Sequence, residues 1–274
     1  KEQTRRIIYG THKRRNYSMR TEFFIAYQTI VRKEFLRFAR IWIQTILPSV
    51  ITIFLYITIF GNFIGSRIGE IKGFSYIDYI IPGLVIMPII SNSYMNVVGS
   101  FYSSRFQRSC EELLVSPVPN SIILLGYITG GVIRAFVVGI AVFAVTTFFT
   151  DIEIANLSFV VLITFLTAFL FSTAGFINAV FAKSFDDINI ITTFVLTPLT
   201  YLGGTFYSIE ALPQFWQDAS IVNPIAYIIS SYRYGFLGLE ESSIMWSLFI
   251  IISLIIILYV IALMLLSRGI GVKN

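Results

Sequence analysis

The chain has 274 residues and a formal net charge of +5, and 56% of its residues are hydrophobic while only 13% are charged. Its mean hydropathy is +0.79. An ordinary soluble domain needs a more charged surface, so this composition indicates an integral membrane protein. Apolar runs of about twenty residues favour helical spans over a β-barrel, whose strands alternate over about ten residues.

The chain contains one cysteine, Cys110, and one histidine, His12. A single cysteine excludes an internal disulfide, and neither residue occurs in the number that a cysteine- or histidine-based metal centre needs. We therefore expect no metal site and no cofactor bound by this chain.

Basic residues are concentrated at the start of the chain. Eleven of the twenty lysines and arginines precede Ile41, namely Lys1, Arg5, Arg6, Lys13, Arg14, Arg15, Arg20, Arg32, Lys33, Arg37 and Arg40. Such a block is typical of nucleic-acid binding or of a cytoplasmic flank that obeys the positive-inside rule, and we favour the flank. Residues 1–20 are expected to form a basic segment without a signal peptide, with Met19 as a candidate native start.

An amphipathic helix is expected over residues 21–40. Thr21 can cap its start, and Glu22 lies in its first turn. One face carries the apolar residues Phe24, Tyr27, Val31, Phe35, Phe38 and Trp42, and the opposite face carries Glu22, Thr29, Lys33, Arg37 and Arg40. The pattern predicts a helix lying on the cytoplasmic membrane surface, the alternative being a packed helix of a small N-terminal domain.

Residues 41–274 are predicted to form one all-α membrane domain of six spans. The spans cover residues 41–64, 79–101, 121–149, 157–181, 188–206 and 244–266. Each is long enough to cross a hydrocarbon core of about 30 Å. Pro48, Pro82 and Pro88 are expected to kink the first two spans.

The third span contains two stripes of small residues. Gly126 and Gly130 form one, and Gly131, Ala135 and Gly139 form the other. Small residues at this spacing let helix backbones approach closely, so we expect the stripes to mediate packing within or between subunits.

Charge bias predicts that both termini are cytoplasmic. The cytoplasmic side then also carries Arg105, Arg108, Lys183, Arg268 and Lys273. The outer loops carry Glu70, Asp78, Asp151, Glu153, Glu210, Asp218, Glu240 and Glu241 against only Arg67, Lys72 and Arg233. This asymmetry is the one that the positive-inside rule requires.

The loop of residues 103–120 is the best candidate contact for a partner protein. Arg108 precedes Glu111 and Glu112 by three and four residues, so the charges share a helical face. Phe106, Leu113 and Leu114 add apolar contacts. A short helix of this kind suits docking into a groove of another protein, the alternative being a helix lying on lipid headgroups.

Arg134 is the one ionisable residue deep within a predicted span. An intramembrane charge is costly and is a functional candidate for that reason. The alternative is a structural role, in which Arg134 pairs with a carbonyl or with a carboxylate near the end of a span.

Residues 196–238 are mostly apolar but are interrupted by Pro198, Gly203, Gly204, Pro213 and Pro224. A plain span would not be broken so often, and a soluble loop would be more polar. The pattern predicts a segment that enters the membrane, turns and leaves on the same side.

Enzyme motifs are absent from the sequence. It contains no HExxH, no GxSxG and no GxxxxGK[ST] loop that would cradle nucleotide phosphates. We therefore expect no catalytic residue, and any ATP that drives transport must be bound by another polypeptide.

Several motifs together resemble the ABC-2 type of ABC transporter permease, and within it the YadH-like group of bacterial inner-membrane permeases. They are RIWIQTILPSVIT at 40–52, FGNFIGSRIG at 60–69, FQRSCEELLVSPVP at 106–119, FAKSFDDIN at 181–189, TPLTYLGGTFYS at 197–208 and NPIAYIISSYRYGFLG at 223–238. The resemblance extends from about residue 21 to the C-terminus, and it rests on the order and spacing of the motifs.

This resemblance implies a homodimeric permease that joins two copies of a separate ATPase subunit, which binds ATP and magnesium. The N-terminal helix and the first cytoplasmic loop would contact the ATPases, the coupling residues being Arg105, Arg108, Glu111, Glu112, Leu113 and Leu114. A re-entrant pair of short helices would span residues 207–238. The expected outer gate comprises Gly203, Gly204, Phe206, Pro213, Trp216, Asn223 and Pro224.

The function predicted from the sequence is therefore an export permease in a bacterial inner membrane, with lipid, glycan or hydrophobic drug as cargo. A stand-alone ion-coupled carrier is the first alternative, although the scarcity of buried carboxylates argues against it. A membrane scaffold without transport is the second.

Overall fold

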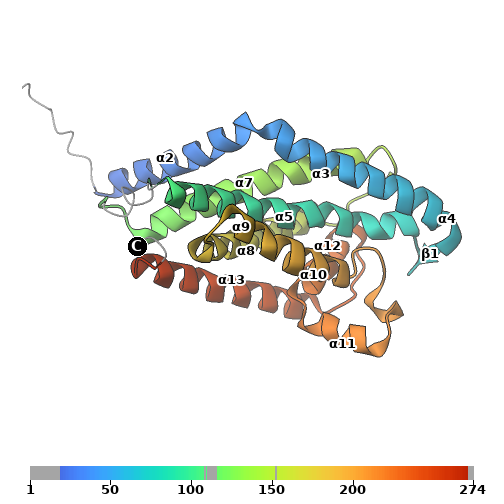
Figure 1. Cartoon of the computed structure of the whole chain (residues 1–274). Coiled ribbons are helices and arrows are strands. Elements are labelled where there is room, and N and C mark those ends of the chain that lie inside the picture. Colours follow the sequence, from blue (N-terminus) through green and yellow to red (C-terminus); the bar gives the residue numbers. More distant parts are fainter. Residues whose placement is uncertain (1–18, 108, 110–115, 152, 271–274) are drawn as a thin grey trace, which may run out of the picture.

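The computed structural model describes residues 19–107, 109, 116–151 and 153–270, and nearly all of this part of the chain is helical (Figure 1). Long helices run side by side along one axis. The start of α2 and the end of α13 lie at one end of the bundle, which we call the α2 end, and the β1–β2 hairpin and α11 lie at the other, the α11 end (Figure 1).

The elements follow one another along the chain with short connections. They are α2 (Met19–Arg40), α3 (Trp42–Tyr56), the π-helix η1 (Ile57–Ile64), α4 (Gly65–Ile68), β1 (Glu70–Ile71), β2 (Phe74–Ser75), α5 (Tyr76–Phe106), α7 (Asn120–Thr146), α8 (Leu157–Phe181), α9 (Phe185–Ile191), the π-helix η2 (Thr192–Leu196), α10 (Thr197–Leu202), the 3-10 helix η3 (Ile209–Ala211), α11 (Gln214–Val222), α12 (Pro224–Leu237) and α13 (Ile244–Ser267). The two short strands pair antiparallel, with Glu70 opposite Ser75.

Five of the described helices are long and apolar enough to cross a membrane. They are Trp42–Gly61, Tyr76–Phe106, Asn120–Thr146, Leu157–Phe181 and Ile244–Ser267. They correspond to the predicted spans 41–64, 79–101, 121–149, 157–181 and 244–266, with ends that differ by a few residues. The predicted span 188–206 corresponds to the run α9–η2–α10, which is not among these five.

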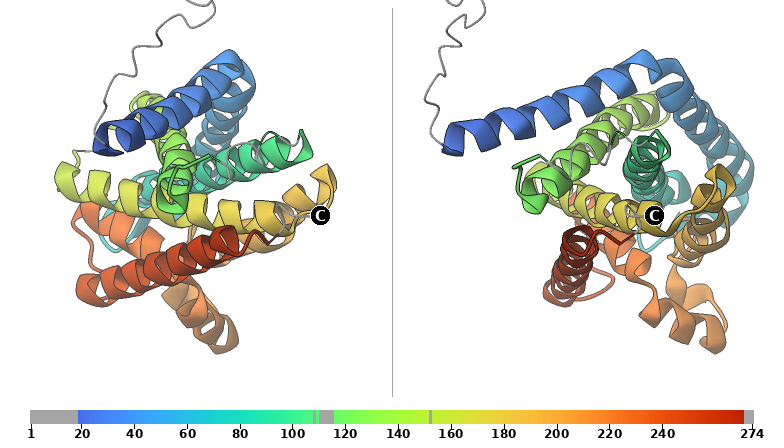
Figure 2. Two further views of the ribbon diagram at one scale, coloured as in Figure 1. Left: turned by 90° about the vertical axis from the view of Figure 1, so that its left-hand side faces the viewer. Right: turned by 60° about the vertical axis from the view of Figure 1, so that its left-hand side comes forward.

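Helix α5 forms the core of the bundle. In the most apolar 18-residue stretch of α5, 83% of the residues are buried inside the protein, against 11% in the corresponding stretch of α13. It packs against α7 and α8 along its length and against α12 near the α11 end. Figure 2 shows α5 near the centre of the bundle, with α13 at the periphery. The exposed surface of α13 is the kind that lipid covers, because its side chains are almost entirely apolar.

The small-residue stripes of α7 pack within the chain. A Cβ atom on Gly126 would lie 2.6 Å from Ile30 Cγ2 of α2, and one on Gly130 would lie 2.6 Å from Glu34 Cβ. On the other stripe, Gly131 faces Ser172 of α8 and Val97 of α5. The glycines thus let α2, α5 and α8 approach the backbone of α7.

Helix α2 docks on α7 with a face that overlaps the predicted apolar stripe only in part, at Tyr27 and Phe38. Ile30, Glu34 and Phe38 are buried, and the Tyr27 hydroxyl lies 2.8 Å from Thr129 Oγ1. Phe24 and Phe35, which belong to the predicted apolar stripe, are exposed. Packing against α7 decided the buried face, because Gly126 and Gly130 lie directly against Ile30 and Glu34.

Candidate functional site

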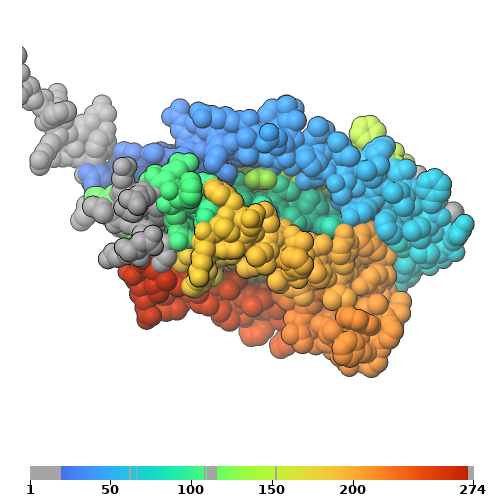
Figure 3. Space-filling view, in the orientation of Figure 1, coloured from blue at the N-terminus to red at the C-terminus, as the bar shows by residue number. Residues whose placement is uncertain are grey.

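A half-exposed face of α5 forms the floor of a groove. Met87, Ser91, Met95 and Gly99 recur every four positions and are partly exposed, while the residues between them on α5 are buried. One wall is α3. The other is the α9–η2–α10 run, where the Thr192 hydroxyl donates to Met95 Sδ at 3.3 Å. Figure 3 shows part of α5 exposed between these segments.

A cavity of about 200 Å³ lies between the groove's floor and its α3 wall. Its lining combines polar and apolar side chains, namely Pro48, Ser49, Thr52, Ile53, Met87, Pro88, Ser91 and Asn92. These residues come from the middle of α3 and the middle of α5. Half of these side chains are polar, and the Ser49 and Ser91 hydroxyls donate to the Thr45 and Met87 carbonyls of their own helices at 3.4 and 3.3 Å.

Arg134 joins this polar layer from α7. Its Nε and Nη2 atoms donate to Asn92 Oδ1 at 3.2 and 2.9 Å. Asn92 Nδ2 in turn donates to Ser49 Oγ at 3.1 Å and to the Pro88 carbonyl at 3.0 Å. One asparagine therefore connects α3, α5 and α7 near the middle of the bundle.

The guanidinium of Arg134 has no carboxylate partner in the described part of the chain. The ion pairs within 4.0 Å there are Arg37–Glu34, Lys72–Glu210, Lys72–Glu241 and Arg233–Glu241. The sequence suggested a carbonyl or a carboxylate as the structural partner, whereas the partner observed is a neutral side-chain amide. The positive charge of Arg134 is thus hydrogen-bonded but not neutralised.

Aromatic side chains join the two walls of the groove at the α11 end. The hydroxyls of Tyr56, at the end of α3, and Tyr201, in α10, lie 3.0 Å apart. The ring of Phe206 packs against both, with centroids 5.5 Å from Tyr56 and 5.8 Å from Tyr201, and lies 4.8 Å from Phe60 of η1. The groove is therefore closed at this end, and Phe206, a predicted gate residue, is part of the closure.

The other predicted gate residues shape the turns beyond α10. Gly203 ends α10, and Gly204 adopts φ = 84°, a left-handed conformation that favours glycine. Pro213 precedes α11, and Trp216 is exposed on it. Asn223 caps α12 by accepting from the Ile225 amide at 3.0 Å and donates to the Leu199 carbonyl, while Pro224 is the first residue of α12.

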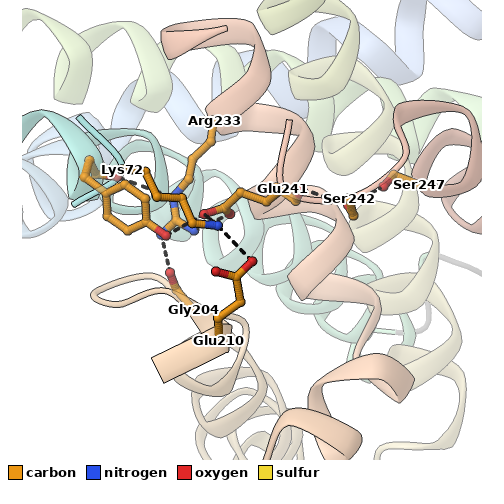
Figure 4. Close-up of polar contacts among 9 residues, drawn as sticks. Lys72, Gly204, Glu210, Arg233, Glu241, Ser242 and Ser247 are labelled. Atoms are coloured by element: carbon orange, nitrogen blue, oxygen red, sulfur yellow. Dashed lines mark hydrogen bonds and ion pairs between the residues drawn. The ribbon is translucent and has the colours of Figure 1, made fainter. Parts of the chain in front are cut away.

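A second arginine, Arg233 of α12, lies at the centre of an ionic cluster at the α11 end (Figure 4). It is the largest fully buried side chain of the described chain, at 0% exposure. Nη1 donates to Glu241 Oε2 at 2.7 Å, Nη2 donates to the Gly204 carbonyl, and Nε donates to the Tyr79 carbonyl at 3.3 Å. The guanidinium also stacks 4.0 Å from the Tyr79 ring centroid.

Glu241 links this cluster to the β1–β2 turn. Its Oε1 accepts from the Tyr79 hydroxyl at 2.5 Å and lies 3.7 Å from Lys72 Nζ, which also pairs with Glu210 at 3.0 Å. Burial by itself raises the pKa of the Glu241 carboxyl, but Arg233, the Tyr79 hydroxyl and Lys72 outweigh burial and hold that pKa below its ordinary value. The cluster thus ties the α10–α11 turn to α5 and to the segment before α13.

At the α2 end, a third cluster fastens α2 to the floor of the groove. Glu34 is buried and accepts from the Ser100 hydroxyl at 2.5 Å and from Arg37 Nη2 at 3.0 Å. The same Arg37 atom donates to the backbone carbonyl and the side chain of Asn96, both at 2.9 Å. Because Asn96 and Ser100 belong to α5, these hydrogen bonds join α2 to α5.

Of the predicted coupling residues, the structure describes Arg105. Its Nη1 atom donates to the carbonyls of Val180 at 2.9 Å and Ala182 at 3.2 Å and to that of Ala179, so it fixes the end of α5 against the end of α8. Arg108, Glu111, Glu112, Leu113 and Leu114 lie outside the described residues.

Sequence reasoning missed the two ion pairs that contain a buried side chain, Arg233–Glu241 and Arg37–Glu34. It placed Arg233 and Glu241 in outer loops, and it did not assign Glu34 to either face of its helix. The only signal for Glu34 was its spacing of three residues from Arg37, and such pairs are common on solvated helices. Nothing local to Arg233 indicates that Tyr79 and Gly204 surround it.

A family model and two individual proteins each match most of this chain. A family model described as "ABC-2 type transporter" matches residues 25–237. The inner membrane transport permease YadH of Escherichia coli K12 is 51% identical over 252 residues, which cover 92% of this chain and 98% of that protein. Nodulation protein J of Rhizobium meliloti is 24% identical over 208 residues, covering 76% of this chain and 79% of that protein.

Proposed function

Because the chain belongs to the ABC-2 type transporter family, we propose that it is the permease subunit of an ABC exporter in a bacterial inner membrane. Five apolar helices of spanning length support a multi-pass membrane protein. The proposal includes three more specific statements. The pathway forms between two copies of the chain, ATP hydrolysis by a separate ATPase drives transport, and each copy crosses the membrane six times.

The observation that carries the proposal is the polar groove along α5. A single chain supplies a floor, two walls and a closed end, and it leaves Met87, Ser91, Met95 and Gly99 open on one side. A second copy facing the first would complete a pathway between the two grooves. The π-helices η1 and η2 both border this groove, and such segments are often found at functional sites.

The distribution of lysine and arginine assigns each end of the pathway to one side of the membrane. With both termini in the cytoplasm, the α2 end faces inward and the aromatic closure of Tyr56, Tyr201 and Phe206 faces outward. The groove then corresponds to an inward-facing resting state from which cargo leaves when the closure opens. In this arrangement the α9–η2–α10 run is the fifth span.

The pair α11–α12 would then form the re-entrant segment at the outer surface. The exposed apolar side chains of α11 suit the boundary between lipid and water, and they include Phe215, Trp216, Ile221 and Val222. Broken helices of this kind are tolerated where protein satisfies the backbone, as Asn223 and Arg233 do here.

Coupling to an ATPase would act through α2 and the loop after α5. The contacts of Glu34 and Arg37 with Ser100 and Asn96 transmit a displacement of α2 to the floor of the groove. ATP and magnesium would be held by the partner.

Charge reversal in the coupling loop tests the proposal. The permease is co-expressed with a candidate ABC ATPase from the same genome, and the Glu111→Lys, Glu112→Lys double variant is expected to lose most ATPase co-purification. Reversals at Glu70 and Glu153, which lie at the α11 end, are the matched control and should retain it. Equal co-purification by both doubles would refute the coupling assignment, and ion-driven transport by the permease alone would favour the carrier.

Crosslinking tests the homodimer. In a Cys110→Ser background, a cysteine at exposed Phe194 on the rim of the groove should join two copies through a short bis-maleimide. A cysteine at exposed Ile140, which borders a separate apolar cavity on the opposite face of α5, should not. Equal crosslinking at both positions would argue against a dimer through the groove.

A further inference from the structure

The uncompensated charge of Arg134 sits beside the cavity that opens on the proposed pathway. Asn92 both accepts from Arg134 and lines that cavity together with Ser49 and Ser91. A charge at mid-depth without an acid partner is costly to the protein alone. The free-energy cost of burying this charge falls when a ligand supplies the missing negative charge.

We propose that Arg134 and Asn92 form a binding site for the acidic headgroup, phosphate or carboxylate, of an amphiphilic cargo. This inference rests on the proposed function, because it places the site within the transport groove. An arginine presents five N–H donors in a planar fork, and Asn92 Oδ1 accepts from only two of its nitrogens. The Nε–Nη2 edge of the guanidinium is thus engaged by Asn92, which holds its orientation, and the Nη1–Nη2 edge, whose Nη1 makes no hydrogen bond within the described residues, is left for an anion.

The cavity suits a headgroup with an attached apolar chain. The Ser49 and Ser91 hydroxyls, which donate to the Thr45 and Met87 carbonyls at 3.4 and 3.3 Å, would turn toward the oxygens of an acid group, while Ile53, Met87 and Pro48 offer apolar surface beside them. A volume of about 200 Å³ accommodates a headgroup but not a whole lipid, so the chain would lie along the groove.

A carboxylate from a second copy does not neutralise Arg134 either. In a dimer of facing grooves, the partner presents the same lining residues, and the residues that line this cavity include no Asp or Glu. The one fully buried acid of the described chain, Glu34, is already bonded to Arg37 and Ser100. The geometry therefore favours an anionic ligand over a protein acid.

Direct binding to the purified full-length permease, in a neutral maltoside detergent, tests the site. Native mass spectrometry measures the binding of dodecyl phosphate, with dodecyltrimethylammonium and inorganic phosphate as the other arms. Dodecyl phosphate should bind at least about tenfold better than either, since charge-assisted bonds and chain burial both contribute. Equal displacement of dodecyl phosphate by the same concentration of inorganic phosphate would overturn the amphiphile assignment.

Two variants separate a ligand site from a structural contact. Arg134→Gln should weaken dodecyl phosphate binding about tenfold or more, and Arg134→Lys should weaken it less because the charge remains. Asn92→Asp places a carboxylate beside the guanidinium, so it should also abolish binding while leaving a folded protein. Arg67→Gln removes an equal charge from an exposed position and is the matched control.

Circular dichroism and thermal unfolding confirm in each case that the variant is folded. Unchanged binding by Arg134→Gln, or by folded Asn92→Asp, would overturn the inference. Because this assay contains no ATPase and no ATP, its failure is distinguishable from failure of the proposed function, which would appear as loss of ATPase co-purification in the unmodified protein.

Discussion

Arg233 and Arg134 occupy opposite electrostatic environments within one bundle. Arg233 is fully buried, pairs with Glu241, donates to two backbone carbonyls and stacks on Tyr79. Arg134 is partly buried and bonds a single neutral amide. In Arg233 each guanidinium nitrogen donates a hydrogen bond within the fold, whereas Arg134 keeps its charge and part of its donors for a ligand. Burial alone therefore does not tell a structural charge from a functional one.

Arg37 lies between these extremes. Its side chain is 31% exposed, and it pairs with Glu34, whose side chain is 0% exposed. The three arginines form a graded series in which the number of committed partners falls from Arg233 through Arg37 to Arg134. Removing the acid partner of Arg233, the acid partner of Arg37 and the guanidinium of Arg134 should test that order.

The largest effect is expected from Glu241→Gln. The change leaves Arg233 charged, buried and without its acid, which costs about 3–5 kcal/mol of unfolding free energy when a buried pair is broken. Glu210→Gln is the matched control, because its exposed pair with Lys72 contributes about 0–1 kcal/mol. Thermal or denaturant unfolding in detergent measures both, and equal stabilities would show that the cluster does not hold the fold.

The same pair should make stability depend on pH. The pKa of Glu241 is lower in the folded protein than in the unfolded chain, so its contribution is fully present above the unfolded value of about 4.5 and is lost as pH falls through the folded value. The difference in unfolding free energy between wild type and Glu241→Gln should be constant near neutral pH and shrink in acid. A difference that grows in acid would contradict this assignment.

A smaller loss is expected from Glu34→Gln. The amide keeps the shape but weakens the charge-assisted bonds from Arg37 and Ser100, which is worth about 1–3 kcal/mol. Glu22→Gln, on the same helix but exposed, is the control. Because these bonds join α2 to α5, the variant should also weaken coupling between the ATPase rate and transport, which reconstituted vesicles would measure.

The smallest effect on stability is expected from Arg134→Gln. It removes a charge that nothing in the described chain neutralises, so unfolding free energy should change by less than about 1 kcal/mol. Transport should nevertheless fall. A loss of stability as large as that of Glu241→Gln would show that Arg134 is a structural residue, and the comparison between the two arginines would then be wrong.

Much of the fold follows from the sequence alone. The span 157–181 coincides with α8, and the start of the last span coincides with that of α13, because long apolar runs have few stable alternatives to a membrane helix. Local signals also located the breaks, since Pro224 begins α12 after the Asn223 cap and Gly204 adopts the positive φ that glycine favours.

The partners of those helices were decided only by tertiary structure. Hydropathy sums local properties, whereas Arg233 meets the Tyr79 carbonyl across 154 positions of sequence, and Gly130 meets Glu34 from another helix. The sequence showed that Arg134 is intramembrane, but only packing could show that its neighbour is Asn92 and not an acid. Side-chain neutralisation depends on three-dimensional proximity, which one-dimensional patterns of polarity do not contain.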